Sequence, residues 1–135
     1  MHSIRTAGLL VIQEKKLLLA YSRNKQAFYL PGGKANPHET SLEALMREVD
    51  EELHIKLDQE HTFYYKHITA PAFGEASGMI MEQDCFISDL KEIPKPDAEI
   101  EMVKYFDRNA YAQEPQQVPG VLMIMQELSK DRLID

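Results

Sequence analysis

The segment from Thr40 to Leu53 constrains the fold more than any other part of the chain. Thr40 and Glu43 have the spacing of a capping box, in which each side chain accepts a hydrogen bond from an otherwise unpaired backbone N–H at a helix start. The apolar residues of the segment recur at intervals of three and four, at Leu42, Leu45, Met46, Val49 and Leu53. This spacing places them along one side of a helix of about three turns that begins at Thr40.

Short apolar runs outside this helix predict β-strands at residues 4–12, 17–21, 27–30, 63–69, 78–88 and 100–106. The first two runs are separated by the charged stretch 13–16 and are expected to pair as a hairpin. A proline and two glycines end the third strand and begin a loop that runs to about Glu39. A second amphipathic helix is expected at residues 118–130. This order of elements predicts an α/β (α+β) fold, a mixed β-sheet with helices packed on its faces.

The length and charge of the chain narrow the classes of function. A chain of 135 residues is expected to form one domain, residues 1–135. The formal net charge of -7 argues against binding to a nucleic-acid polymer, whose phosphates would meet a repelling surface. No apolar run approaches the roughly 20 residues of a membrane span. The N-terminal segment lacks the pattern of a signal peptide, so a cytoplasmic protein without membrane contact is expected.

Three glutamates share one arc of the predicted helix, beside its apolar side: Glu48, Glu51 and Glu52. Like charges at this spacing repel, and partial burial increases the cost, so a divalent cation is expected to stabilise them. All the donors are hard oxygens and no His or Cys shares the spacing, which favours Mg²⁺, with Mn²⁺ as a substitute. Arg47 is placed to hold Glu48 or Glu51 by a charge-assisted hydrogen bond. For these four charges taken alone, the alternative is a solvated helix face.

Residues 33–55 also match a family motif. The motif is a glycine, five residues, a glutamate, seven residues, Arg-Glu, an aliphatic residue, one residue, Glu-Glu, one residue, a glycine and an aliphatic residue. Its fixed positions are occupied here by Gly33, Glu39, Arg47, Glu48, Val49, Glu51, Glu52 and Ile55. The stretch therefore resembles the signature box of the Nudix (MutT-like) hydrolases. The one departure is His54, which replaces a glycine just past the helix end, where a left-handed backbone costs a non-glycine residue about 1 kcal/mol.

The resemblance implies a fold and a reaction. It implies a Nudix-type α/β/α sandwich that hydrolyses the diphosphate linkage of a small nucleoside diphosphate derivative. Divalent cations held by the box would lower the pKa of a bound water, and a glutamate would accept its proton. The alternative is a non-catalytic nucleotide-binding or sensor domain on the same fold. A homodimer and a monomer are both open, and the sequence does not identify the nucleotide derivative.

The resemblance also implies roles for single residues. The metal ligands are expected to be Glu48, Glu51 and Glu52, with the loop carbonyl of Gly32 or Gly33. The substrate-binding residues are expected to be Gly33, Lys34 and Glu39, with Glu39 supporting the site through Arg47 or a water. The alternative for Lys34 is a surface lysine without a role in the site.

The expected catalytic residues are the same box glutamates and Arg47. In many family members a glutamate before a late strand acts as the base. Glu101 or Glu99 has that place here, and a solvated strand edge is the alternative for both.

Overall fold

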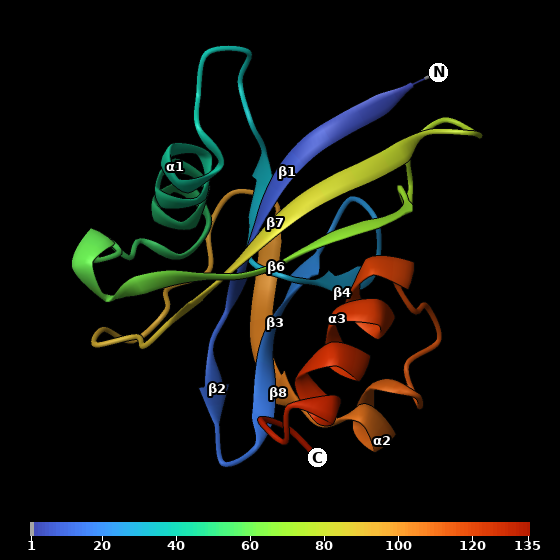
Figure 1. Ribbon diagram of the computed structural model, residues 1–135. Coiled ribbons are helices and arrows are strands. Elements are labelled where there is room, and N and C mark those ends of the chain that lie inside the picture. Colours follow the sequence, from blue (N-terminus) through green and yellow to red (C-terminus); the bar gives the residue numbers. More distant parts are fainter. Residues whose placement is uncertain (1) are drawn as a thin grey trace.

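Two four-stranded β-sheets form the centre of the molecule in the computed structural model, which describes residues 2–135 (Figure 1). The first sheet is mixed, has the strand order β5-β1-β7-β6, and comprises β1 (Ser3–Leu10), β5 (Gly32–Lys34), β6 (Thr62–Pro71) and β7 (Ile80–Ser88). In this sheet β1 runs parallel to β7, and the other pairs are antiparallel. The second sheet is antiparallel and is built around β3, with the strands β2 (Ile12–Gln13), β3 (Lys16–Ser22), β4 (Ala27–Tyr29) and β8 (Ile100–Phe106).

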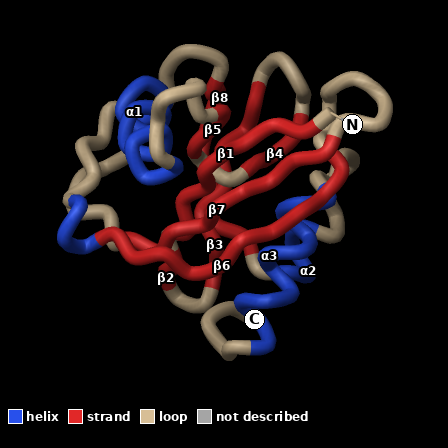
Figure 2. Tube along the Cα trace, turned by 45° about the horizontal axis from the view of Figure 1, so that its top comes forward, coloured by secondary structure: helices blue, strands red, loops and turns tan. Residues whose placement is uncertain are grey.

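Helices lie on both sides of the strands. The helical segments are α1 (Ser41–Leu53), the 3₁₀ helix η1 (Gln59–His61), α2 (Arg108–Tyr111) and α3 (Pro119–Lys130). Figure 2 shows α1 on one side and α2 with α3 on the other. Leu18 of β3 enters the core under α1, whereas Leu17 and Leu19 enter the core under α3. Strands buried on both faces read as uninterrupted apolar runs. The structure confirms the predicted α/β/α sandwich.

The first helix agrees with its sequence signals at both ends. Thr40 Oγ1 accepts a hydrogen bond from the Glu43 N–H at 3.1 Å, and the Glu43 carboxylate accepts one from the Thr40 N–H at 2.8 Å, which completes the capping box. Leu45 and Val49 on the apolar side are fully buried. His54 follows the helix with φ 56° and ψ 42°, the left-handed conformation expected where the family motif has glycine.

The predicted hairpin between residues 4–12 and 17–21 forms only at its tip. There β2 pairs with β3 across a turn in which Glu14 and Lys15 have φ of 51° and 61°, as a tight hairpin turn requires. The rest of the first run, β1, instead pairs with β7 from Ser3↔Ile80 to Leu10↔Ile87. The prediction was wrong here because an apolar pattern shows that a strand is buried but does not identify its partner.

The segment expected to be a loop after β4 contains β5. Its residues pair with β1, from Thr6↔Lys34 to Gly8↔Gly32. The two glycines of β5 read as breakers in the sequence, but the long-range pairing with β1 holds them in an extended strand. No helix among residues 2–135 is long and apolar enough to cross a membrane.

Candidate active site

A cavity of about 370 Å³ receives side chains from both sheets, from α1 and from the residue that precedes α3. Its charged lining residues are Lys25, Lys34, Glu48, Glu52, Glu75 and Glu99. Apolar and aromatic side chains also line it, among them Ile4, Tyr29, Leu30, Phe73, Met81 and Val118. A ligand that fits this cavity would therefore carry both a charged part and an apolar or aromatic part.

The glycines of β5 give the α1 carboxylates access to the cavity. A Cβ atom on Gly33 would lie 2.5 Å from Glu48 Oε2, so any larger residue here would displace this carboxylate from its position. Gly32 has φ +131°, and a Cβ there would lie 2.0 Å from the Ala7 carbonyl oxygen, so this position also requires glycine. The Gly32 N–H donates a hydrogen bond to Glu52 Oε1 at 3.1 Å. The glycine pair thus sets the place of both glutamates.

Glu52 is the most buried carboxylate of the site, with 7% of its surface exposed. Burial is the main cause that raises its pKa to about 8. The hydrogen bond from Gly32 lowers this pKa, and the negative charges of Glu48, Glu99 and Glu51 raise it. No cation of the described chain is among the causes. An added cation would therefore favour the charged form of Glu52.

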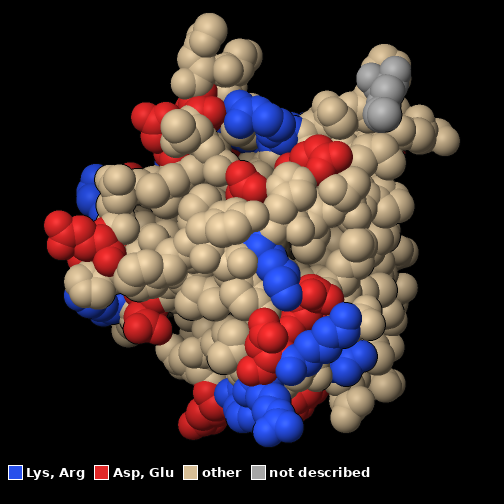
Figure 3. Space-filling view, viewed as in Figure 1, with Lys and Arg blue, Asp and Glu red and all other residues tan. Residues whose placement is uncertain are grey.

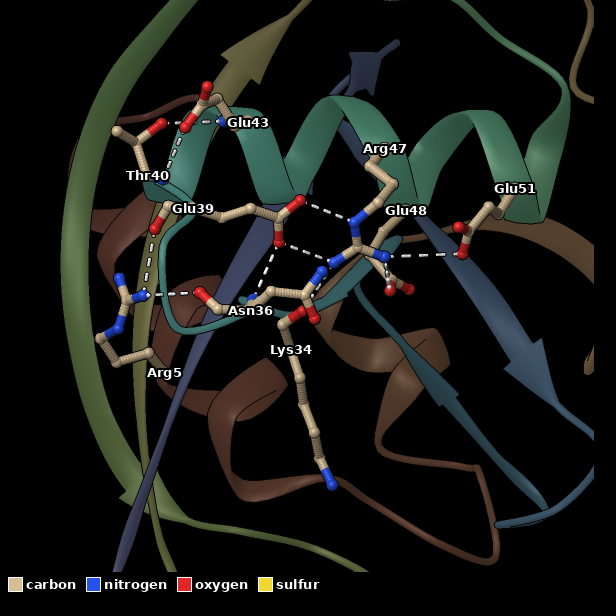
Figure 4. Close-up of polar contacts among 9 residues, drawn as sticks. All are labelled: Arg5, Lys34, Asn36, Glu39, Thr40, Glu43, Arg47, Glu48 and Glu51. Carbon is tan, nitrogen blue, oxygen red and sulfur yellow. Dashed lines mark hydrogen bonds and ion pairs between the residues drawn. The ribbon is translucent and has the colours of Figure 1, made fainter.

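Arg47 joins α1 to the loop that precedes it (Figure 4). Its Nε and Nη2 donate to the two Glu39 oxygens at 2.7 and 2.9 Å, and its Nη1 donates to Glu48 Oε1 at 2.7 Å. Nη2 also donates to the Lys34 carbonyl at 3.0 Å. Hydrogen bonds from Arg47 and from the Asn36 N–H lower the pKa of Glu39 to about 2. The guanidinium therefore fixes the loop and orients Glu48.

The remaining residues expected from the box lie in two different environments. Glu51 is 57% exposed and lies 3.6 Å from Arg47, and it is not among the residues that line the cavity. Lys34 does line the cavity, where its Nζ pairs with Glu75 at 3.1 Å. The structure therefore places Lys34, but not Glu51, at the wall of the cavity.

The two glutamates near the start of β8, Glu99 and Glu101, also lie in different environments. Glu99 lines the cavity, and its Oε2 accepts hydrogen bonds from Ser22 Oγ at 3.2 Å and from Asn24 Nδ2 at 3.1 Å. Glu101 is 54% exposed, does not line the cavity, and lies 3.9 Å from Arg23. The geometry favours Glu99 over Glu101 as a participant in the site.

The side chains of the site fit a divalent cation in chemistry, although they are not already gathered around one position. Among residues 2–135, no three His, Cys, Asp or Glu side chains converge closely enough to hold a metal ion. However, Glu48 and Glu52 both line the cavity, and burial raises the pKa of both carboxyls, for Glu48 in spite of the hydrogen bond from Arg47. Their oxygens suit Mg²⁺ or Mn²⁺.

Several polar or charged residues that line the cavity were not among the predicted site residues. Glu75, from the loop between β6 and β7, pairs with Lys25 at 3.0 Å as well as with Lys34. Nothing in the local sequence marks this long-range pairing. Thr6 and Gln83 also line the cavity and come from neighbouring strands. Gln83 has no clear local signal, because polar residues flank it in β7, Glu82 and Asp84.

Comparison with known proteins places the chain in a family. The protein-family model for the NUDIX domain matches residues 2–126 of this chain. The chain belongs to the Nudix hydrolase family, whose members typically depend on a divalent metal. A search of curated proteins gave no significant match.

Solved structures share the fold at low sequence identity. The solution structure of the E. coli ORF135 protein is 23% identical, with a TM-score of 0.75 over 98% of this chain and 92% of that chain. A MutT Nudix hydrolase from Burkholderia pseudomallei is 20% identical, with a TM-score of 0.73 over 94% of this chain and 98% of that chain. A bifunctional NMN adenylyltransferase/ADP ribose pyrophosphatase from Francisella tularensis, complexed with AMP and Mn ion, is 21% identical, with a TM-score of 0.67 over 96% of this chain and 42% of that chain.

Proposed function

We propose that residues 1–135 form one Nudix domain that hydrolyses the diphosphate linkage of a small nucleoside diphosphate derivative in a Mg²⁺-dependent reaction. The observation that carries the proposal is that Glu48 and Glu52 of α1 meet Glu99 at one cavity that also contains Lys34. Family membership supports the hydrolase class. The complex of the Francisella tularensis protein with AMP and Mn ion supports a nucleotide and a divalent cation.

Glu48 and Glu52 are the proposed metal ligands, with the Gly32 carbonyl as a further donor and Glu51 as a ligand that must turn inward. When bound, Mg²⁺ or Mn²⁺ neutralises the diphosphate and lowers the pKa of a bound water. Arg47 positions Glu48, and Glu39 acts through Arg47.

Lys34 and the backbone of Gly33 are proposed to bind the substrate phosphates. Lys34 is paired with Glu75 in this structure, and Lys25 shares the same carboxylate. A substrate phosphate would replace Glu75 as the partner of these two ammonium groups. Glu99 is the proposed proton acceptor for the attacking water, because it lines the cavity and its carboxylate is held by Ser22.

A small nucleotide fits the surface better than a nucleic-acid polymer does. The formal net charge is -7, and Figure 3 shows acidic and basic side chains interspersed on the face in view. The alternative of a non-catalytic binding domain is less well supported, because all the glutamates of the box are present in this chain.

The test is hydrolysis of a panel of nucleotides that contains ADP-ribose, normal and oxidised nucleoside triphosphates, dinucleoside polyphosphates and nucleotide sugars. Wild-type protein with Mg²⁺ is expected to release a nucleoside monophosphate from at least one compound, and EDTA should abolish release. Glu52→Gln should lower the rate by at least about 100-fold, whereas the exposed control Glu101→Gln should not. Absence of hydrolysis across the panel, or equal rates for wild type and Glu52→Gln, would refute the proposal.

A further inference from the structure

The side chain of Gln83 is a buried amide in the wall of the cavity. Gln83 lies in β7 and is only 8% exposed. Within residues 2–135, the one hydrogen-bond partner of its side chain is the Cys85 thiol, whose Sγ lies 3.8 Å from Gln83 Oε1. The Nε2 donor has no partner there. Since no buried side-chain nitrogen or oxygen of the described residues lacks a partner, this unpaired nitrogen is open to solvent at the cavity that Gln83 lines. The amide is therefore available to pair with a ligand there.

The surrounding residues leave space for this amide. A Cβ atom on Gly8 would lie 3.1 Å from Gln83 Cδ and 3.2 Å from Gln83 Nε2, so the glycine of the neighbouring strand leaves room for the side chain. Thr6 is paired with Gln83 across β1 and β7 and also lines the cavity. The only hydrogen bond of the Thr6 hydroxyl within the described chain is a long one, 3.5 Å to the Glu82 carbonyl. Polar groups of two adjacent strands are therefore available to one ligand.

Other side chains that line the same cavity suit a flat heterocycle. Tyr29 and Phe73 pack edge to face, with ring centroids 6.1 Å apart, and both line the cavity. Met81, two residues before Gln83 in β7, also lines it. Aromatic and thioether groups favour contact with the faces of aromatic rings. An amide among them can hydrogen-bond only to the edge of such a ring.

The register of the sheet sets the distance from Gln83 to the phosphate-binding region proposed above. Thr6 of β1 is paired on one side with Lys34 of β5 and on the other with Gln83 of β7. Two strand spacings therefore separate Lys34 from Gln83, about 10 Å between backbones. A nucleoside between the two would direct its phosphates to Lys34 and its base to Gln83.

We propose that Gln83 reads the base of the nucleotide substrate, through hydrogen bonds between its amide and the donor and acceptor edge of a purine or pyrimidine. This inference rests on the proposed function, because it assigns the base to the same cavity. It adds a specificity-determining residue that lies far from the box in sequence. Since a site built to hydrogen-bond its ligand discriminates strongly against ligands that leave its polar groups unpaired, Gln83 controls the choice among bases.

The test compares substrates that differ only in the base. For the best substrate of the panel, kcat/KM is measured for the adenine, guanine, cytosine and uracil forms. Wild type is expected to prefer one or two bases by about 10- to 100-fold. Gln83→Leu should reduce this preference to about threefold or less, mainly through KM, and hydrolysis should remain Mg²⁺-dependent. Gln13→Leu, the same change at an exposed strand position, should leave the preference unchanged.

A second variant at the same position tests the proposal even if Gln83→Leu does not fold. Gln83→Glu retains the shape of the side chain and replaces the amide donor by an acceptor, so it should shift the preference toward guanine, adenine and cytosine, which carry an amino donor, and away from uracil, which has none. The proposal is overturned if Gln83→Leu and Gln83→Glu keep the wild-type preference, or if wild type shows none.

Measurements of nucleotide binding test the role of Gln83 separately from the proposed hydrolysis. Calorimetry with AMP, GMP, CMP and UMP measures base preference without turnover. If wild type hydrolyses nothing but Gln83→Leu loses the base preference in binding, the proposed function fails and the role of Gln83 stands. If wild type hydrolyses its substrate and Gln83→Leu retains the preference, the role of Gln83 fails and the proposed function stands.

Discussion

The backbone N–H of Gly32 donates a hydrogen bond to the Glu52 carboxylate, with 3.1 Å between Gly32 N and Glu52 Oε1. The contact joins β5 to the glutamate-bearing side of α1, and it is the one hydrogen bond that the Glu52 side chain makes within the described chain. One neutral donor compensates only part of the cost of burying a charge. Ionisation of Glu52 therefore destabilises the metal-free folded protein.

Metal-free protein should lose stability as the pH rises from about 5 to about 8. The pKa of Glu52 is about 8 in the folded state, against an ordinary value of 4.5 in the unfolded chain, so the unfolded chain ionises first and unfolding becomes more favourable between these values. Below this range of pH, Glu52 is protonated in both the folded and the unfolded state, so its ionisation does not lower the free energy of unfolding. The loss is up to about 4 kcal/mol in the free energy of unfolding, measured by urea denaturation in EDTA.

Glu52→Gln is the control for this pH dependence. Glutamine still accepts the hydrogen bond from Gly32 but does not ionise, so the variant should lack this part of the slope. Added Mg²⁺ should also remove it from wild type, because a cation favours the charged carboxylate. Identical pH profiles for wild type and Glu52→Gln in EDTA would contradict the assignment.

Gly33→Ala should displace Glu48 and lower Mg²⁺-dependent turnover by about 100-fold, because a displacement of about 1 Å at a reacting site has an effect of this size. The cause is the 2.5 Å contact that the new Cβ would make with Glu48 Oε2. A double-mutant cycle for the free energy of unfolding tests this cause. Gly33→Ala should destabilise wild type but not Glu48→Ala, and equal losses in both backgrounds would rule out the clash.

Arg47→Lys should destabilise the protein by about 1–3 kcal/mol, since an ammonium cannot reproduce the fork of hydrogen bonds to Glu39 and Glu48. The variant should also need more Mg²⁺ for half-maximal rate, because Glu48 is no longer oriented. Arg108→Lys is a matched control, since Arg108 makes one long side-chain hydrogen bond, 3.4 Å to Ser129 Oγ. Chemical denaturation should show a loss in the free energy of unfolding for Arg47→Lys that is well above the loss for the control. Equal losses would contradict a stabilising role for the hydrogen bonds of Arg47 to Glu39 and Glu48.

Glu99 and Glu101 give a matched pair for the proposed base. Glu99→Gln should lower kcat by about 10²- to 10⁴-fold, as is usual for loss of a general base. Glu101→Gln should leave kcat within about twofold of wild type, because Glu101 lies outside the cavity. Single-turnover rates measure the chemical step directly. A large loss in Glu101→Gln with none in Glu99→Gln would exchange the two roles.

Local signals in the sequence were sufficient for α1 and for much of the secondary structure. The capping box depends on residues three apart, and the apolar side of α1 depends on spacings of three and four, so no distant contact is needed to predict either. The strand from Ile100 to Phe106 also agrees with its predicted bounds. The glutamates of the box were found in the same way, because one helix carries them.

Long-range contacts explain what the sequence did not reveal. Pairing with β1 makes β5 a strand despite its two glycines, and pairing with β7 draws β1 away from the predicted hairpin. Glu75 reaches the cavity through ion pairs with Lys25 and Lys34, which are distant in the chain. Glu99 and Glu101 could not be distinguished in the sequence, because their separation depends on where β8 begins beside β3.

The position of the bound metal tests the central claim most directly. Crystals grown with Mn²⁺ give anomalous scattering that locates the ion. The account predicts an ion in the cavity at about 2.0–2.4 Å from carboxylate oxygens of both Glu48 and Glu52, with no such ion in crystals of Glu52→Gln. An ion bound away from these two glutamates, or one that persists at the same place in Glu52→Gln, would contradict it.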